Sequence, residues 1–240
     1  MFPEQAMRLA RASHVAFAAV MIAIGIQGLL TGRFTPVWQP VPASVPARGA
    51  LVYLCAVVSL VCGASLLWKR TAVSAARVLL ASLVFWLIVF RIGDIVRAPI
   101  AFGPWDGCAE TAAIVAAAWA LSGLHVSVAR VLFGLSLVSF GIGHFVYPKE
   151  TAALVPHWLP AHLPLAYLTG CTFVAAAASV LINARAPIAA SLAALQIGLF
   201  TLLVWVPIVF AGSPSRSDWS EFGISAALTV ASWVVAATYG

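Results

Sequence analysis

Long runs of apolar residues, separated by short polar or proline-rich connections, make up almost the whole chain. Each run is about 17 to 24 residues long, enough for a helix to cross the hydrocarbon of a bilayer. Helices are expected because a lipid-exposed backbone must satisfy its own hydrogen bonds, and the runs lack the polar alternation of a membrane β-barrel. The pattern predicts an all-α membrane protein with eight transmembrane helices, near residues 14–32, 50–68, 72–90, 109–124, 131–147, 164–182, 187–210 and 222–239.

Composition agrees with this prediction. Of the 240 residues, 63% are hydrophobic and 8% are charged, and the mean hydropathy is +1.04, outside the range of ordinary soluble domains. The formal net charge is +6, but the basic residues are scattered over the connections and form no patch interleaved with aromatics. Nucleic-acid binding is therefore not expected. The first run follows Arg8 and Arg11 without a small-residue cleavage site, which predicts a retained membrane anchor.

The sequence repeats itself at an offset of 114 residues. The segment YLCAVVSLVCGASLL from Tyr53 resembles YLTGCTFVAAAASVL from Tyr167, and Trp105 and Trp219 have the same spacing. An even number of spans brings both copies into the membrane from the same side, so the repeats are parallel and favour a pseudo-two-fold bundle. The pattern predicts two four-helix units in tandem, residues 1–125 and 126–240.

Charge gives a weak indication of orientation. Lys and Arg divide almost evenly between the two predicted sides, while six of the seven acidic residues lie opposite the termini. Acidic residues contribute little to the positive-inside rule. We expect both termini in the cytoplasm, with the connection after the fifth helix facing outward.

A family resemblance rests on residues 141–170, GIGHFVYPKETAALVPHWLPAHLPLAYLTG. The features that carry it are Gly141, His144, Phe145, Pro148, Pro156, Trp158, Leu159, Pro160, Tyr167, Leu168 and Gly170. This stretch resembles the DoxX-like family of four-helix bacterial membrane proteins, and the N-terminal unit resembles that family through its similarity to the second unit. Family members often carry a glutamate in the next helix, where this chain has Phe173, and Ser59 in the first unit. The resemblance implies a bacterial inner-membrane protein associated, as for some members, with redox or quinone-linked chemistry.

His144 is the first candidate ligand-binding residue. It precedes Pro148 by four positions and falls in the last turn of its predicted helix, where an ionisable group is a functional candidate. A hydrogen bond to a backbone carbonyl is the structural alternative. A metal site of His144, His157 and His162 with Glu150 would have suitable ligand types, but their spacing matches no known pattern, and no metal is predicted.

Two proline-rich connections carry the tryptophans Trp38 and Trp158. Prolines on both sides favour an extended backbone, and indole rings often anchor at lipid headgroups. Irregular backbone at membrane depth needs cover from protein or water. We therefore expect both loops to fold over the mouth of the bundle and roof a cavity, with the two tryptophans and His157 at its entrance.

Charged residues recur every three positions in the third predicted helix and its extension, at Arg91, Asp94 and Arg97. If the helix continues, Asp94 pairs with both arginines. The alternative is that Arg91 binds an anionic headgroup or a quinone oxygen while Asp94 orients it. Gln27, within the first span, is a further candidate for hydrogen bonding to a ligand or to another helix.

Other polar residues predict structural roles. Asp106 and Asp218 open the fourth and eighth helices, where either can cap exposed amides. Cys55 and Cys62 are seven positions apart, include no CxxC motif and favour buried structural thiols over a redox pair.

The combined expectation is a membrane component of a redox or quinone-linked system that binds a lipid-soluble molecule, with quinone as the candidate cofactor. His144 and Arg91 would hydrogen-bond the ligand's oxygens. Independent catalysis is not expected, and a quinone-linked oxidoreductase subunit is the enzymatic alternative. Two other classes remain open: an accessory or chaperone-like protein that contacts another membrane or redox protein, and a small-solute transporter. Small-residue faces such as VAAAASV also permit a homodimer.

Overall fold

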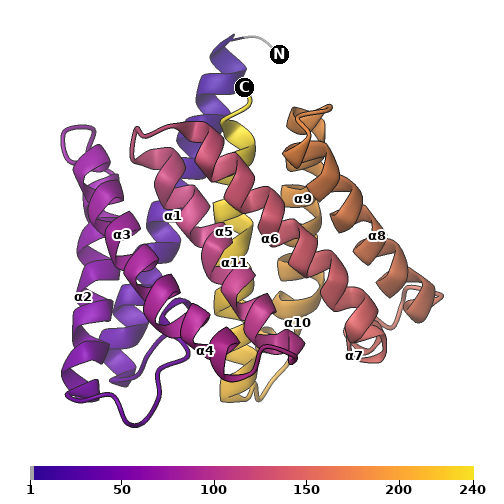
Figure 1. The fold of residues 1–240 in the computed structure, drawn as a ribbon, viewed down its shortest axis with the longest axis horizontal. Helices are drawn as coiled ribbons and strands as arrows, with labels where there is room; N and C mark the ends of the chain where they lie inside the picture. Colours follow the sequence, from indigo (N-terminus) through magenta and orange to yellow (C-terminus); the bar gives the residue numbers. More distant parts are fainter. Residues whose placement is uncertain (1–2) are drawn as a thin grey trace.

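The computed structural model describes the backbone of residues 3–240 and the side chains of residues 11–240 (Figure 1). All eight predicted segments are helical, and no strand occurs in this part of the chain. The elements are α1 (Pro3–Thr31), the 3₁₀ turn η1 (Pro36–Trp38), α2 (Arg48–Leu66), α3 (Ala72–Trp86), the π-helix η2 (Leu87–Arg91), α4 (Ile92–Arg97), α5 (Phe102–Leu121), α6 (Val126–Val146), α7 (Pro148–Ala153), α8 (His162–Leu181), α9 (Ala186–Phe200), the π-helix η3 (Thr201–Trp205), α10 (Val206–Phe210) and α11 (Arg216–Ala237).

Seven helices of the described chain are long and apolar enough to cross a membrane. They are Arg11–Thr31, Arg48–Leu66, Ala72–Arg97, Val126–Val146, His162–Leu181, Ala186–Phe210 and Arg216–Ala237. The predicted eighth span corresponds to α5, which is not one of the seven. Two carboxylates, Asp106 and Glu110, lie in its first half, while Ala113 and the residues from Ala116 to Ala118 are fully buried in its second. α5 is thus a central packing helix.

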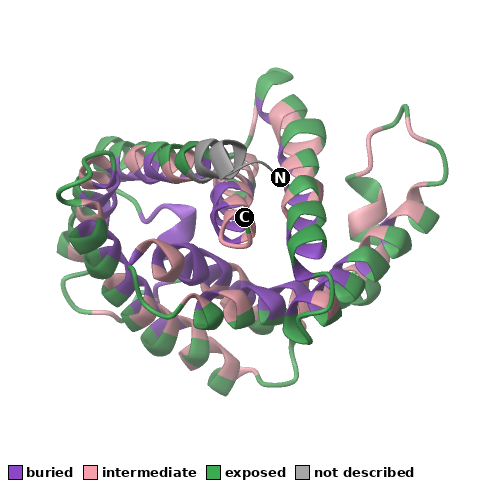
Figure 2. Ribbon diagram, turned by 90° about the horizontal axis from the view of Figure 1, so that it is seen from above, coloured by how far each residue is buried: buried purple, intermediate pink, exposed green. Residues whose placement is uncertain are grey.

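The long helices form a closed ring. Each packs against the next long helix along the chain, in the order α1, α2, α3, α5, α6, α8, α9 and α11. The last of these, α11, packs against α1 and so closes the ring. α5 and α11 also contact each other across the middle. Figure 2 shows that the buried surfaces gather where these helices meet and that the exposed surfaces point outward. The beginning of α1 and the end of α11 lie at one end of the bundle (Figure 1); the opposite end, which holds the 32–47 and 154–161 connections, is here called the loop end.

Irregular features recur at equal spacing along the chain. The π-helices begin at Leu87 and Thr201, 114 positions apart, and interrupt otherwise continuous helices. A left-handed residue precedes α2 at Ala47 and α8 at Ala161, again 114 positions apart. π-Helical turns change the angular position of the residues that follow, and they are frequent at functional sites.

Glycines set the closest helix contacts. A Cβ atom on Gly25 of α1 would lie 2.5 Å from the backbone nitrogen of Leu60 in α2. On Gly141 of α6 it would lie 2.6 Å from a methyl group of Val174 in α8. Small residues therefore allow both helix pairs to approach closely, as in other membrane bundles.

Candidate functional site: a membrane-facing groove at His144

An apolar groove of about 780 Å³ lies between α8 and α9, and His144 of α6 lines it. The loop after α7 contributes Leu154, Val155 and Leu159 to the same groove. Residues of this loop and His144 therefore line the same groove. The other lining residues are Thr151, Pro156, Leu165, Leu168, Thr169, Thr172, Ala175, Ala176, Ser179, Arg185, Ile188, Ala189, Leu192, Ala193, Leu195, Gln196, Leu199, Phe200, Leu203 and Trp205.

Backbone and aromatic contacts fix the His144 ring. Its Nδ1 lies 2.8 Å from the carbonyl oxygen of Phe140, one helical turn earlier. The ring stacks on Phe200 of α9 with centroids 6.0 Å apart, and it lies 5.4 Å from the ring of Phe173 in α8. Gly170 leaves room for this arrangement, because a Cβ there would lie 2.8 Å from the Cβ of His144.

The hydrogen bond to Phe140 determines the tautomer of His144. A carbonyl oxygen only accepts hydrogen bonds, so Nδ1 must carry a proton and donate it. In the neutral ring Nε2 is then an acceptor. Within the described part of the chain, Nε2 of His144 has no hydrogen-bond partner. The groove therefore presents an acceptor to a bound molecule.

Other polar groups in the groove wall satisfy one another. Thr172 donates to the side-chain oxygen of Gln196 at 2.7 Å, and Gln196 donates to the backbone carbonyl of Thr169 at 3.1 Å. These bonds link α8 to α9. They leave a largely apolar surface around His144.

Two predicted ligand-binding residues of the loop between α7 and α8, His157 and Trp158, do not line the groove. Trp158 is 71% exposed, and His157 is also exposed. The ring of His157 lies 6.2 Å from that of His162. Among the residues that the structure describes, no group of three His, Cys, Asp or Glu side chains could hold a metal ion.

The structure corrects the expected position of Trp38. Instead of lying at an entrance, Trp38 is 2% exposed and packs in the core. Its indole nitrogen donates to the Ser59 hydroxyl of α2 at 2.7 Å, and its ring meets Trp86 of α3 edge-on at 5.1 Å. Pro36 begins the buried 3₁₀ turn that carries Trp38 into the core. No feature of the sequence indicated that Ser59 would accept the hydrogen bond of the indole.

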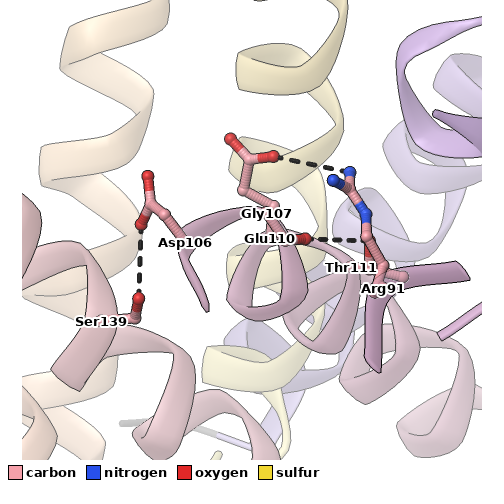
Figure 3. A network of polar contacts seen from close by, with 6 residues as sticks. All are labelled: Arg91, Asp106, Gly107, Glu110, Thr111 and Ser139. Atoms are coloured by element: carbon pink, nitrogen blue, oxygen red, sulfur yellow. Dashed lines mark hydrogen bonds and ion pairs between the residues drawn. The ribbon is translucent and has the colours of Figure 1, made fainter. Parts of the chain in front are cut away.

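The predicted ladder of Arg91, Asp94 and Arg97 forms only in part. Asp94 pairs with Arg97, one turn away. Arg91 turns to α5 instead, where its Nε donates to the Thr111 hydroxyl at 2.8 Å and its Nη2 lies 3.8 Å from Glu110 (Figure 3). The pairing of Asp94 with both arginines was therefore wrong, because α5 supplies Arg91 with partners from a different helix.

Gly107 makes the Arg91 contact with α5 feasible. A Cβ at this position would lie 2.3 Å from Nη1 of Arg91, so a larger residue here would require the guanidinium to shift. Asp106, next to it, accepts a long hydrogen bond of 3.4 Å from Ser139 of α6 (Figure 3). Asp106 therefore joins two helices and does not cap its own, since α5 begins four residues earlier. The network of Arg91, Asp106, Glu110, Thr111 and Ser139 ties η2 and α6 to α5.

Asp218 fulfils the capping prediction as part of a pair. Ser215 is the N-cap of α11, and its hydroxyl accepts from the Asp218 amide at 3.2 Å. The Asp218 carboxylate accepts in turn from the Ser215 amide at 2.7 Å. Such a capping box satisfies two exposed amides at the start of a helix.

The seven sequence-predicted site residues do not share one cavity. His144 lines the α8–α9 groove, while Gln27 lines a second hollow beside α1 and α11. Arg91 of η2 contacts α5, and Asp94 pairs with Arg97 within α4. Sequence reasoning missed the α9 side of the groove, where Phe200 and Gln196 lie, because their apolar surroundings resemble any lipid-facing helix.

Comparison with known proteins adds one finding. Residues 133–235 match a domain of unknown function (DUF8561). The match runs from α6 into α11 and contains His144, Phe173 and Phe200. No curated protein and no solved structure matches the chain.

Proposed function

We propose that this protein binds a lipid-soluble molecule with a hydroxyl-bearing ring in the groove between α8 and α9. The observation that carries the proposal is the His144 ring, whose acceptor nitrogen lines an apolar groove of about 780 Å³. A largely apolar cavity with a few fixed polar groups is the usual form of a small-molecule site.

The surroundings of the groove favour entry of the ligand from the bilayer. Leu168 of α8 and Leu192, Leu195 and Leu199 of α9 line the groove and are each more than 40% exposed. In a membrane these side chains face lipid. The lining extends from Arg185, the N-cap of α9, to Phe200 at the end of this helix, which corresponds to about 22 Å of helix and suits an elongated tail.

The state of His144 favours a donor on the ligand. A neutral His144 that donates from Nδ1 can accept a ligand's O–H at Nε2. A ligand oxygen that only accepts, such as a quinone carbonyl, would require a protonated ring, which is costly among apolar side chains. The site thus prefers a quinol or phenol to a quinone.

A wider role is also proposed, on the basis of the resemblance to the DoxX-like family. The chain would be a bacterial inner-membrane protein of DoxX-like type with cytoplasmic termini, serving a redox or quinone-linked system by holding the reduced molecule. Two tandem four-helix units with eight spans are supported by the spacing of 114 positions between the two π-helices. At the same offset, α5 of the first unit corresponds to α11 of the second, and α1 corresponds to α6. The packing of α5 against α6 therefore matches the packing of α11 against α1.

The test is a binding titration with decylubiquinol and decylubiquinone on protein in nanodiscs, under anaerobic conditions. The wild type should bind the quinol more tightly than the quinone, by about threefold to tenfold for one neutral hydrogen bond. His144→Phe keeps an aromatic ring beside Phe200 but has no acceptor, so the preference should disappear.

His125→Phe is the matched control, because His125 is exposed in the connection before α6 and does not line the groove. It should retain the wild-type preference. Equal binding of quinol and quinone by the wild type, or an unchanged preference in His144→Phe, would contradict the proposal. A stable protein partner purified without any small ligand would instead favour the accessory function.

A further inference from the structure

A second hollow, of about 970 Å³, opens at the loop end of the bundle. It lies where α1 ends and where α2 and α11 begin. The groove at His144 is formed by other helices. The residues that line it are Gln27, Thr31, Gly32, Arg33, Phe34, Thr35, Pro36, Gln39, Pro40, Val41, Arg48, Arg216, Trp219 and Ser220.

The charged side chains that line this hollow are all positive. Arg33, Arg48 and Arg216 line it, and no carboxylate is part of its lining in the described chain. The nearby carboxylate of Asp218 is engaged in the cap of α11, where it accepts from the Ser215 amide at 2.7 Å. Three guanidinium groups around one cavity produce a positive potential that attracts anions.

Two of the lining residues indicate a built site. The guanidinium of Arg48 lies 5.1 Å from the centre of the Phe34 ring, so a cation–π contact helps to hold it beside the hollow. Thr35 is 4% exposed, and its hydroxyl is buried without a hydrogen-bond partner in the described part of the chain. A buried hydroxyl normally has a partner, so a ligand oxygen beside Thr35 would satisfy it.

The first turn of α2 adds backbone donors. Arg48 is the first residue of this helix, and the preceding Ala47 is left-handed and provides no side-chain cap. The first amides of a helix point outward and favour an anion. Arg216 similarly begins α11. The first residues of α2 and α11, Arg48 and Arg216, therefore both line the hollow.

We propose that this hollow binds an anionic phosphate group, which we assign to the headgroup of a membrane phospholipid. Guanidinium groups bind phosphate oxygens bidentately. Trp219 and Val41 supply the apolar and aromatic contacts that suit the boundary between headgroups and hydrocarbon. The inference is independent of the proposed ligand at His144, because the two sets of lining residues share no member.

Native mass spectrometry of the detergent-solubilised full chain tests this site. Phosphatidylglycerol is titrated against phosphatidylcholine, whose headgroup has no net charge. We expect tighter binding of phosphatidylglycerol, reduced about fivefold for each arginine replaced, in Arg33→Gln, Arg48→Gln and Arg216→Gln. Arg48→Lys should recover part of the loss because it restores charge without the bidentate geometry.

Thr35→Val tests the buried hydroxyl with almost no change in shape and should also weaken phosphatidylglycerol binding. Arg70→Gln is the control, since Arg70 is exposed in the connection between α2 and α3 and does not line the hollow. Displacement of the lipid by millimolar inorganic phosphate would support the anion site but identify a soluble phosphate as its source. Equal binding of both lipids, or binding unchanged in all three arginine variants, would overturn the proposal.

Discussion

Replacing Ser59 with alanine tests the burial of Trp38 in the first half of the bundle. The indole nitrogen of Trp38 donates to the Ser59 hydroxyl at 2.7 Å, and that hydroxyl donates to the carbonyl of Cys55 at 2.9 Å. Alanine keeps the helix and leaves the indole ring in place. It removes the acceptor and leaves a buried N–H without a partner.

The magnitude follows from that unsatisfied donor. Leaving a buried polar group unpaired costs about 1–3 kcal/mol, and we expect about 2 kcal/mol for Ser59→Ala because Trp38 is 2% exposed. In a Trp38→Phe background the ring has no N–H to leave unpaired. There the same Ser59→Ala change should cost less than about 0.5 kcal/mol, which gives a coupling of about 1.5 kcal/mol.

The assay is equilibrium unfolding in mixed micelles with increasing sodium dodecyl sulfate, applied to the wild type, both single variants and the double variant. Ser191→Ala is the control, because its exposed hydroxyl donates only to the Pro187 carbonyl at 2.8 Å. Its unfolding free energy should match that of the wild type. If Ser59→Ala costs the same with and without the indole N–H, the hydrogen bond does not contribute to stability and the reasoning fails.

Two glycine substitutions test close packing with the same unfolding assay. Gly107→Ala would place a Cβ 2.3 Å from Nη1 of Arg91, at the flexible end of that side chain, so it should displace the guanidinium and cost about 1 kcal/mol by weakening its hydrogen bond to Thr111. Gly103→Ala in the same helix meets nothing within 4 Å and should be neutral or slightly stabilising, and equal effects of the two changes would contradict this account. Gly25→Ala would place a Cβ 2.5 Å from the backbone nitrogen of Leu60 and should cost about 1–3 kcal/mol by separating α1 from α2. A wild-type unfolding free energy for Gly25→Ala would show that the two helices are not in close contact.

Helix positions could be predicted from the sequence because apolar runs of membrane length have few other stable conformations. The run predicted at 187–210, for example, matches the helical stretch Ala186–Phe210, which includes the π-helix η3. The run predicted at 109–124 also forms a helix, α5, but among the described residues it is not one of the seven helices apolar enough to cross a membrane, since Asp106 and Glu110 lie in its first half. Its packing against α3, α6 and α11 became apparent only in the fold.

Polar contacts between helices could be predicted less well. Periodicity paired Arg91 with Asp94 on one helix, but Glu110 and Thr111 come from α5 and have no regular spacing from Arg91. The position of His144 at a helix end was visible in the sequence, since Pro148 follows it. Its partner Phe200 lies 56 positions further along the chain and became apparent only in the fold.

The most direct test of the groove is mass spectrometry of the organic extract from protein purified in mild detergent. Wild type is compared with Ala175→Trp, which places an indole ring into the groove lining, and with His144→Phe. The account predicts a stoichiometric lipid-soluble molecule bearing a ring hydroxyl in the wild type, lost from Ala175→Trp and reduced in His144→Phe. Ordinary phospholipid alone, in equal amount in all three samples, would contradict it.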